Sequence, residues 1–445
     1  MKILIVSLQF EKTSTGGGGV HVEHITDQFL ELGHEVTIIS IHTDKTLPEA
    51  DLRTDRKTPY SITERGRLTV IRFLIEKGIA HPYVHEAKDE ELRRIMKFAE
   101  VVVDWIGRHG EDFDVINLQG HHIIPGYMAR QLRGKGPAKI SYLHALETTY
   151  VTEKGEFVGA YDGTKEVLAR IRRWESMCRY ADLVIANSPM VRDDFKRIVS
   201  EFDEVSKYEE RITVLASGCN KDFLMEDELI RRKLGRSPET VELVTFCRVD
   251  PSKGVEYSIK GSVEAARLSV GRKFRLTVAG IPSSEAYIEK LRTLAEGVPA
   301  NLEVSFELKD TISPLEEKKQ ILDSKHIYIL PTLKEPFGMS LIEASARGNM
   351  VVSADTNGPM YMFDAEKGEE TDWGTVTDCG VLARITREPE VNLAGNIGKA
   401  VIWTVGNWPE SLERVINFNS KIRANWTWEG IARRYVELFK EQQVH

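Results

Sequence analysis

The chain has 445 residues, of which 41% are hydrophobic and 29% are charged, a composition typical of a globular protein. One hydrophobic core rarely serves so long a chain, so we expect two domains. The net charge of −8 argues against a general nucleic-acid-binding protein, because such proteins carry a basic surface.

The N-terminal half alternates predicted strands and helices, which indicates a parallel doubly wound sheet. Apolar side chains recur at helical spacing over 22–32, and Gly33 ends that helix. His21 and His24, on its first turns, are expected to be surface histidines. Short apolar runs predict strands at 3–6, 34–40, 114–118, 139–143 and 181–188.

No segment is apolar over a length that spans a bilayer. The first ten residues hold only a short apolar run followed by charges, so we expect a strand there and not a signal peptide. The cysteines (Cys178, Cys219, Cys247 and Cys379) are scattered without zinc-binding spacing, which favours a reducing compartment. We therefore expect a cytoplasmic protein.

Two segments of this half are candidates for ligand contacts. The glycines of "TGGGG" (15–19) follow the first strand, and they let the backbone approach a ligand beside a helix terminus that favours anions. His121 and His122 follow one strand, and His144 follows the next. A neutral histidine there can bind a hydroxyl group or accept a proton, although each is also open to a structural interpretation.

The alternation restarts near 211–220, with strands predicted at 241–246, 274–280, 302–306, 326–330 and 350–354. We place the domains at 1–217 and 218–420, with a closing amphipathic helix within 421–445. If the two sheets face each other, their carboxyl ends border a shared cleft, where ligands of such sheets bind.

Charged residues lie at two strand ends of the C-terminal half. Arg248 and Lys253 follow a predicted strand and precede a helix, a position that suits a diphosphate. In "EPFGMSLIE", Glu335 and Glu343 flank a loop-to-helix junction near Gly338, where carboxylates can accept hydrogen bonds from sugar hydroxyls. The alternative is that Glu335 is a salt-bridged loop residue, that Glu343 lies on a solvated helix face and that the cations lie on the surface.

In this order, the motifs resemble retaining glycosyltransferases of family 4, which have the GT-B fold, an α/β architecture of two doubly wound Rossmann-like domains. "EPFGMSLIEASARG" is similar to the two-acid signature of that family, and "CRVDPSKG" is similar to its "GRLxxxKG" segment. "TVLASGCN" resembles its domain junction, and "WTWEGIARRYVELF" resembles its closing helix, which crosses back to the first domain.

The resemblance implies an N-terminal acceptor domain and a C-terminal donor domain. It implies that Arg248 and Lys253 bind the diphosphate of a nucleotide sugar, Glu335 the hexose and Glu343 the ribose. The backbone of the segment after Glu335 would cradle the sugar, and the first glycines would let the first domain approach the donor or acceptor. The residues so assigned are Phe337, Gly338, Met339, Gly16 and Gly17. No cofactor is implied, and a divalent metal is not expected to be essential.

The chain departs from the family pattern in several places, among them Asn117 and Gln119 where many members have histidines, and Cys247 where they have a glycine. "HHIIPGY" matches the sucrose-phosphate synthase branch and makes His121 the expected active-site histidine, with His122 and Gln119 as alternatives. The segment 361–380 looks like an insertion without an assigned role.

The resemblance predicts a retaining enzyme that transfers a hexose to the hydroxyl group of a sugar, a sugar phosphate or another small metabolite. A nucleotide-sugar epimerase, a phosphorylase and a sugar-binding protein without turnover are the alternatives. Acceptor contacts are expected from the loops at 41–66, 79–92 and 145–165.

Overall fold

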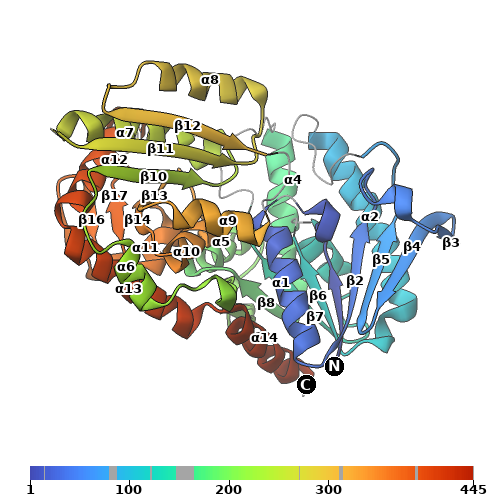
Figure 1. Ribbon diagram of the computed structural model, residues 1–445. Helices are drawn as coiled ribbons and strands as arrows, with labels where there is room; N and C mark the ends of the chain where they lie inside the picture. Colours follow the sequence, from blue (N-terminus) through green and yellow to red (C-terminus); the bar gives the residue numbers. More distant parts are fainter. Residues whose placement is uncertain are drawn as a thin grey trace. The chain divides into compact units, whose positions relative to one another are not determined.

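The computed structural model describes residues 1–14, 16–79, 88–120, 123–146, 165–269, 271–309, 314–385 and 389–443. The chain forms two compact units (Figure 1). The first holds the described residues up to Ser217 together with those from Trp428 onward, and the second holds Gly218–Thr427.

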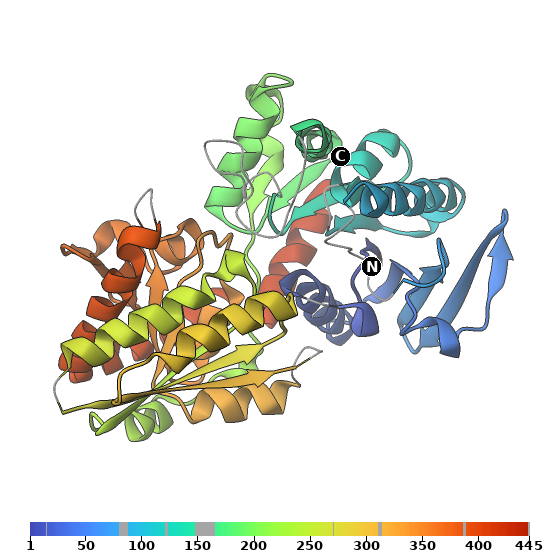
Figure 2. The ribbon, with the colours of Figure 1, turned by 90° about the horizontal axis from the view of Figure 1, so that it is seen from above.

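The sheet of the first unit is parallel except at one edge, where β3 and β4 run antiparallel (Figures 1 and 2). Its strand order is β3-β4-β5-β2-β1-β6-β7-β8-β9. The strands are β1 (Lys2–Val6), β2 (Glu35–Ile41), β3 (Arg53–Asp55), β4 (Thr58–Arg65), β5 (Leu68–Phe73), β6 (Val115–Gln119), β7 (Ala138–Leu143), β8 (Leu183–Ala186) and β9 (Ile212–Val214).

The helices of this unit include its last segment, α14, which packs on α1. Phe29 of α1 contacts Tyr435 and Phe439 of α14, with ring centroids 5.9 and 5.8 Å apart. The helices are α1 (Gly17–Glu31), α2 (Lys88–His109), α3 (Ala129–Gln131), α4 (Lys165–Ser176), α5 (Pro189–Ser200) and α14 (Trp428–Gln443). A π-helical turn spans Ile123–Met128, and 3-10 turns span Glu11–Thr13, Leu47–Glu49, Gly110–Asp112, Met177–Tyr180, Val205–Lys207 and Glu209–Arg211.

The sheet of the second unit has the order β12-β11-β10-β13-β14-β17-β16-β15. Strands β13 and β14 are buried along their whole length, as expected of parallel strands with helices on both faces. The strands are β10 (Thr240–Phe246), β11 (Lys273–Gly280), β12 (Leu302–Leu308), β13 (Ile327–Leu330), β14 (Met350–Ala354), β15 (Glu369–Glu370), β16 (Gly374–Val376) and β17 (Val381–Ala383).

Two helices of this unit, α7 and α12, pack unusually closely because glycines lie at their contact. A Cβ atom at Gly261 would collide with Ile397, and one at Gly398 would lie 2.6 Å from the Cβ of Glu264. The helices are α6 (Asp227–Lys233), α7 (Val255–Leu268), α8 (Glu285–Glu296), α9 (Leu315–Asp323), α10 (Met339–Ala346), α11 (Asn357–Met362), α12 (Pro389–Gly406) and α13 (Trp408–Asn425). Short 3-10 turns span Lys221–Phe223, Pro251–Lys253 and Ala365–Lys367.

Every predicted strand is present, with shifts of about two residues or less at its ends. Three segments differ from expectation. The predicted loop at 41–66 contains β3 and β4, the segment 361–380 supplies β15 and β16, and helix α13 continues past the predicted boundary at 421. Strands β3, β4, β15 and β16, like β5, β9 and β17, were not predicted, because their pairing depends on partners elsewhere in the sheet, which periodicity cannot reveal.

Across the described ranges, every helix is too short or too polar to cross a bilayer.

Candidate active site

The second unit has a topological switch point between β10 and β13. Strand β11 lies beside β10 on one side, and β14 lies beside β13 on the other, so the strand order reverses between them. Ligands of doubly wound sheets bind outside the carboxyl ends of the strands at such a point. The loops that follow β10 and β13 carry three predicted residues, Arg248, Lys253 and Glu335.

The loop after β10 is organised by Asp250. Its carboxylate accepts a hydrogen bond from the backbone N–H of Ser252 (2.8 Å), which caps the 3-10 turn, and forms an ion pair with the Nε–H of Arg248. Gly254 ends the turn at a φ of +62°, and a Cβ there would collide with the carbonyl oxygen of Pro331. The two site loops therefore touch through a glycine.

Asp250 lies in this loop, and the sequence analysis did not single it out. Burial disfavours its charged form, but Arg248 and the hydrogen bonds from Ser252 outweigh burial and hold the pKa of Asp250 below its usual value. The Arg248 side chain is 44% exposed, whereas that of Asp250 is 8% exposed. Asp250 thus anchors a guanidinium group that faces solvent. The signal was present, because an aspartate directly before a proline is typical of a helix start.

The loop after β13 joins the first loop through an ion pair. The Nζ of Lys253 lies 2.7 Å from Oε2 of Glu335, and these side chains are 21% and 10% exposed. The backbone N–H of Leu333 also donates to the carbonyl oxygen of Ser252 (3.2 Å). The structure therefore brings Lys253 and Glu335 together, and Lys253 is not the surface residue of the alternative interpretation.

Gly338 lies at the N-terminus of α10, as predicted, with a φ of +113° that favours glycine. A Cβ atom there would lie 2.8 Å from Cε of Met362 and would also approach Glu335. The ring of Phe337 is buried against Trp426, with centroids 5.9 Å apart. Phe337 can therefore offer a ligand only its backbone, and Met339 begins the helix.

Glu343 lies on α10 and is paired with a lysine that the sequence analysis missed. The Nζ of Lys318, on α9, donates to Oε1 and Oε2 of Glu343 at 2.8 and 3.0 Å. The side chains of Lys318 and Glu343 are 17% and 22% exposed. No sequence signal identifies this pair, because α9 and α10 are separate helices that meet only in the folded unit.

The first unit also has a switch point, between β1 and β6. Gly16 caps α1, which begins at Gly17, and a Cβ atom at Gly18 would lie 3.8 Å from the ring of His144. Nε2 of His144 lies 3.2 Å from Oε1 of Gln119, at the end of β6. Gly16 and Gly17 as donor contacts stay a prediction.

His121 and His122 lie outside the described residues, so their predicted role is untested. The pair of His144 and Gln119 is neutral, because burial lowers the pKa of His144 to about 3. Gln119 is fully buried, and its Nε2 has no hydrogen-bond partner among the described residues. Neutral donors and acceptors of this kind suit hydroxyl groups better than phosphates.

His21 is fully buried, so its predicted surface position is wrong. Its Nδ1 lies 3.0 Å from Oγ of Ser217, and its Nε2 lies 3.0 Å from the hydroxyl of Tyr435. His24 stacks on Trp428, with centroids 5.3 Å apart. The physical reason is that α14 covers this face of α1, which the local sequence around the histidines does not reveal.

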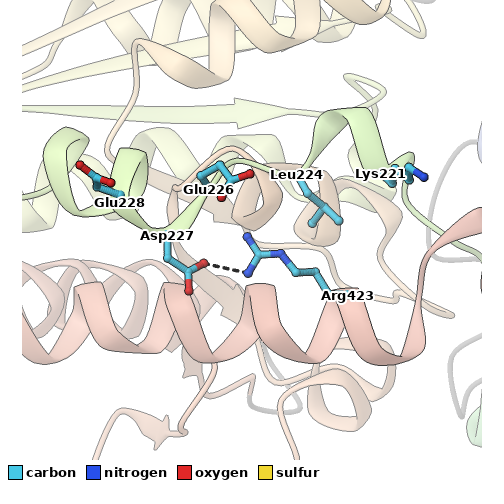
Figure 3. A pocket seen from close by; sticks show the side chains of 6 residues that line it. All are labelled: Lys221, Leu224, Glu226, Asp227, Glu228 and Arg423. Carbon is cyan, nitrogen blue, oxygen red and sulfur yellow. Dashed lines mark hydrogen bonds and ion pairs between the residues drawn. The ribbon is translucent and has the colours of Figure 1, made fainter.

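A surface depression of about 400 Å³ lies on the second unit, near the start of α6 (Figure 3). Asp227 forms an ion pair with Arg423 across it (2.8 Å), and Arg423 also donates to the carbonyl oxygen of Met225. The depression contains none of the predicted site residues, since it is lined by Lys221, Leu224, Glu226, Asp227, Glu228 and Arg423.

Within the ranges that the structure describes, no group of three or more histidine, cysteine or acidic side chains is placed to hold a metal ion. The expectation that catalysis needs no metal stays a prediction.

Two family models match the chain. The model of Glycosyltransferase Family 4 matches residues 15–220, and the model of Glycosyl transferases group 1 matches residues 226–379. The second match contains Arg248, Lys253, Glu335 and Glu343.

Curated relatives extend the match over most of the chain. The D-inositol 3-phosphate glycosyltransferase of Corynebacterium diphtheriae is 26% identical and aligns over 83% of this chain and 82% of its own length. The probable sucrose-phosphate synthase of Thermosipho melanesiensis is 22% identical over 98% of this chain and 93% of its own.

Solved structures establish the fold. The sucrose-phosphate synthase of Thermosynechococcus elongatus has a TM-score of 0.70 at 17% identity, covering 99% of this chain and 98% of its own. Anabaena HepE in complex with UDP and glucose has a TM-score of 0.63 at 14% identity, covering 99% and 100%. The predicted fold class is confirmed. The chain belongs to the glycosyltransferases with the GT-B fold, with family 4 matched by its N-terminal half and group 1 by its C-terminal half.

Proposed function

We propose that this glycosyltransferase moves a hexose from a nucleotide diphosphate sugar to a hydroxyl acceptor with retention of configuration. The observation that carries the proposal is the ion pair of Lys253 and Glu335 beside Arg248, at the switch point of the second unit. Cations for a diphosphate and a carboxylate for hydroxyl groups are thereby held in two adjoining loops.

Arg248 and Lys253 would bind the diphosphate. Negative charge builds on this group as its bond to the sugar breaks, and cations already in place stabilise that charge without rearrangement. Asp250 fixes the guanidinium of Arg248, and Glu335 fixes the ammonium of Lys253. Both cations are partly exposed, so a ligand can reach them.

Glu335 would accept hydrogen bonds from the hexose, and Glu343 from the ribose. The backbone of Phe337, Gly338 and Met339 would lie against the sugar and its phosphate, because Gly338 keeps the start of α10 free of a side chain. Both carboxylates are partly shielded from water, which strengthens such hydrogen bonds.

In the proposed reaction, the bond between the anomeric carbon and the diphosphate oxygen breaks, and the acceptor oxygen bonds to that carbon from the same face. The acceptor proton moves to the departing diphosphate oxygen. No enzyme nucleophile is required, and the two cations supply the charge that a divalent metal would otherwise provide.

The first unit would bind the acceptor. His144 and Gln119 present neutral polar groups at the carboxyl ends of β7 and β6, and His121 is expected beside them. The names of two relatives mention inositol 3-phosphate and sucrose phosphate, so a polyol or sugar, with or without a phosphate, is the acceptor class we propose. His144 and Gln119 would contact its hydroxyl groups.

The proposal is tested first by thermal shift with a panel of UDP-, GDP- and ADP-sugars. A donor that binds the folded protein raises the unfolding temperature by mass action. The best donor is then incubated with phosphorylated and free polyols and sugars, and release of nucleotide diphosphate is measured. The anomeric configuration of the product, read by NMR, decides retention.

Each outcome assigns a reaction. Nucleotide diphosphate release that depends on an acceptor supports the transferase. A rearranged nucleotide sugar without that release indicates an epimerase, and cleavage that depends on inorganic phosphate indicates a phosphorylase. Binding without turnover, together with unchanged affinity in Glu343→Ala, contradicts the proposal and indicates a sugar-binding protein.

A further inference from the structure

The second unit pairs each of its two signature acids with a lysine from another element. Glu335 pairs with Lys253, which the sequence motif includes, and Glu343 pairs with Lys318, which lies outside every motif. Lys318 belongs to α9, far from Glu343 in sequence, and reaches both of its carboxylate oxygens.

The geometry of the pair restricts how Glu343 can move. One ammonium group donating to both oxygens, at 2.8 and 3.0 Å, fixes the rotation of the carboxylate plane. An ionised carboxylate has about four lone-pair sites. Lys318 occupies two of them, which leaves about one on each oxygen for a ligand.

Two remaining acceptor sites match a pair of neighbouring hydroxyl groups. The 2′ and 3′ hydroxyls of a ribose form such a diol, and each can donate one hydrogen bond to one oxygen. A carboxylate that is already oriented loses less conformational entropy when it binds, which is the benefit of preorganisation.

We propose that Lys318 is a positioning residue that holds the carboxylate of Glu343 for the ribose diol of the nucleotide donor. The inference rests on the proposed function, since it specifies how the same site recognises its donor. Lys318 acts through Glu343, and it makes the site selective for ribonucleotide sugars over their 2′-deoxy analogues.

A purely structural pair gives a different expectation. If Lys318 only braced α9 against α10, its loss would affect all donors alike through a general loosening of the site. Selectivity between ribose and 2′-deoxyribose is therefore the readout that separates positioning from bracing.

The experiment measures KM and kcat for a ribonucleotide sugar and its 2′-deoxy analogue in the parent protein and in Lys318→Met. We expect the variant to raise KM for the ribonucleotide sugar about tenfold, the effect of a lost charged hydrogen bond. We expect kcat to stay within about twofold, and KM for the 2′-deoxy donor to change little. Lys318→Arg, which keeps the charge and the donors, should restore most of the selectivity.

The neighbouring Lys319 supplies a matched control. It lies on the same helix with a side chain 18% exposed, but its Nζ pairs with Glu316 at 2.7 Å and not with Glu343. Lys319→Met should leave both donors unchanged. Glu343→Gln should lower the same selectivity as Lys318→Met, and the double variant should add little to either.

The results separate this inference from the proposed function. A parent protein that binds no nucleotide sugar overturns both. A parent that uses such donors, with a Lys318→Met variant that keeps its selectivity or weakens both donors equally, overturns the inference alone. If circular dichroism shows that Lys318→Met has lost its fold, Lys318→Gln is measured instead and read by the same criteria.

Discussion

The parallel strands β5-β2-β1-β6-β7-β8 and β12-β11-β10-β13-β14-β17 follow the same order in the two units, but the carboxyl ends of the two sheets carry different chemistry. At the β10–β13 switch point, Lys253 and Glu335 form an ion pair. At the β1–β6 switch point, Gln119 and His144 are uncharged hydrogen-bonding partners. The comparison teaches that the topology sets where a ligand binds, whereas the side chains at that edge set which ligand it is.

Burial also has different results for two histidines of the first unit and for Asp250 of the second. In the first, burial lowers the pKa of His144 to about 3 and that of His21 well below its usual value, because it disfavours the charged form of an imidazole. In the second, Asp250 stays ionised despite burial because Arg248 and Ser252 stabilise its charge. Charge therefore persists at a buried site only where a partner is supplied.

The largest expected effect follows from removing the charges of the second unit. Lys253→Ala or Glu335→Ala should lower kcat about a hundredfold to a thousandfold, the usual effect of losing one preorganised charge interaction in a transition state. Release of nucleotide diphosphate measures the loss. Lys367→Ala, which removes a lysine with a 72% exposed side chain from the same unit, should retain full activity.

A double variant separates activity lost through misfolding from activity lost because the site charges are gone. Each single change leaves a mostly buried partner unpaired, which lowers stability, whereas Lys253→Met with Glu335→Gln removes both charges. The double variant should recover thermal stability but not activity. Recovery of both would contradict the comparison, because the pair would then be structural.

A smaller effect is expected from the neutral edge of the first unit. His144→Ala should raise KM for the acceptor about fivefold, since a neutral hydrogen bond contributes about 1 kcal/mol, and it should leave donor affinity unchanged. Steady-state kinetics with each substrate varied in turn give both values. His109→Ala, which removes a histidine packed on Trp105, is the control. An equal loss of donor affinity would contradict the proposal that the first unit binds the acceptor and the second unit binds the donor.

The smallest effect concerns pH and the neutral state of His21. The unfolded chain binds a proton at this histidine below a pH of about 6.5, whereas the folded protein does not, so stability falls as pH falls through that value. Between pH 7 and 6, this histidine should account for somewhat less than about 1 kcal/mol of the loss. Urea unfolding at several pH values measures it.

His21→Gln and the parent are compared by the slope of the free energy of unfolding against pH, and not by their absolute stability. His21→Gln is expected to be less stable at every pH because it disturbs the contacts to Ser217 and Tyr435. Its free energy of unfolding should nevertheless fall less steeply below pH 7 than that of the parent. Equal slopes for the parent and the variant would contradict the prediction, because they would mean that His21 binds protons alike in the folded and unfolded protein.

Much of the fold and part of the site could be predicted from local sequence. Short apolar runs predicted the parallel strands, since burial on both faces demands such runs, and Gly338 was placed correctly at a helix start. Arg248, Lys253 and Glu335 were brought to one edge because parallel strands carry their following loops to the same end of a sheet.

The tertiary structure alone decided which partners these groups have. Lys318 meets Glu343 only because α9 and α10 pack together, and His21 is buried because Tyr142, Ser217 and Tyr435 surround its ring. Both contacts join residues far apart in the chain, so no local pattern encodes them. The sequence by itself determined the elements and their motifs, whereas packing determined the charge state and the orientation of the groups that they carry.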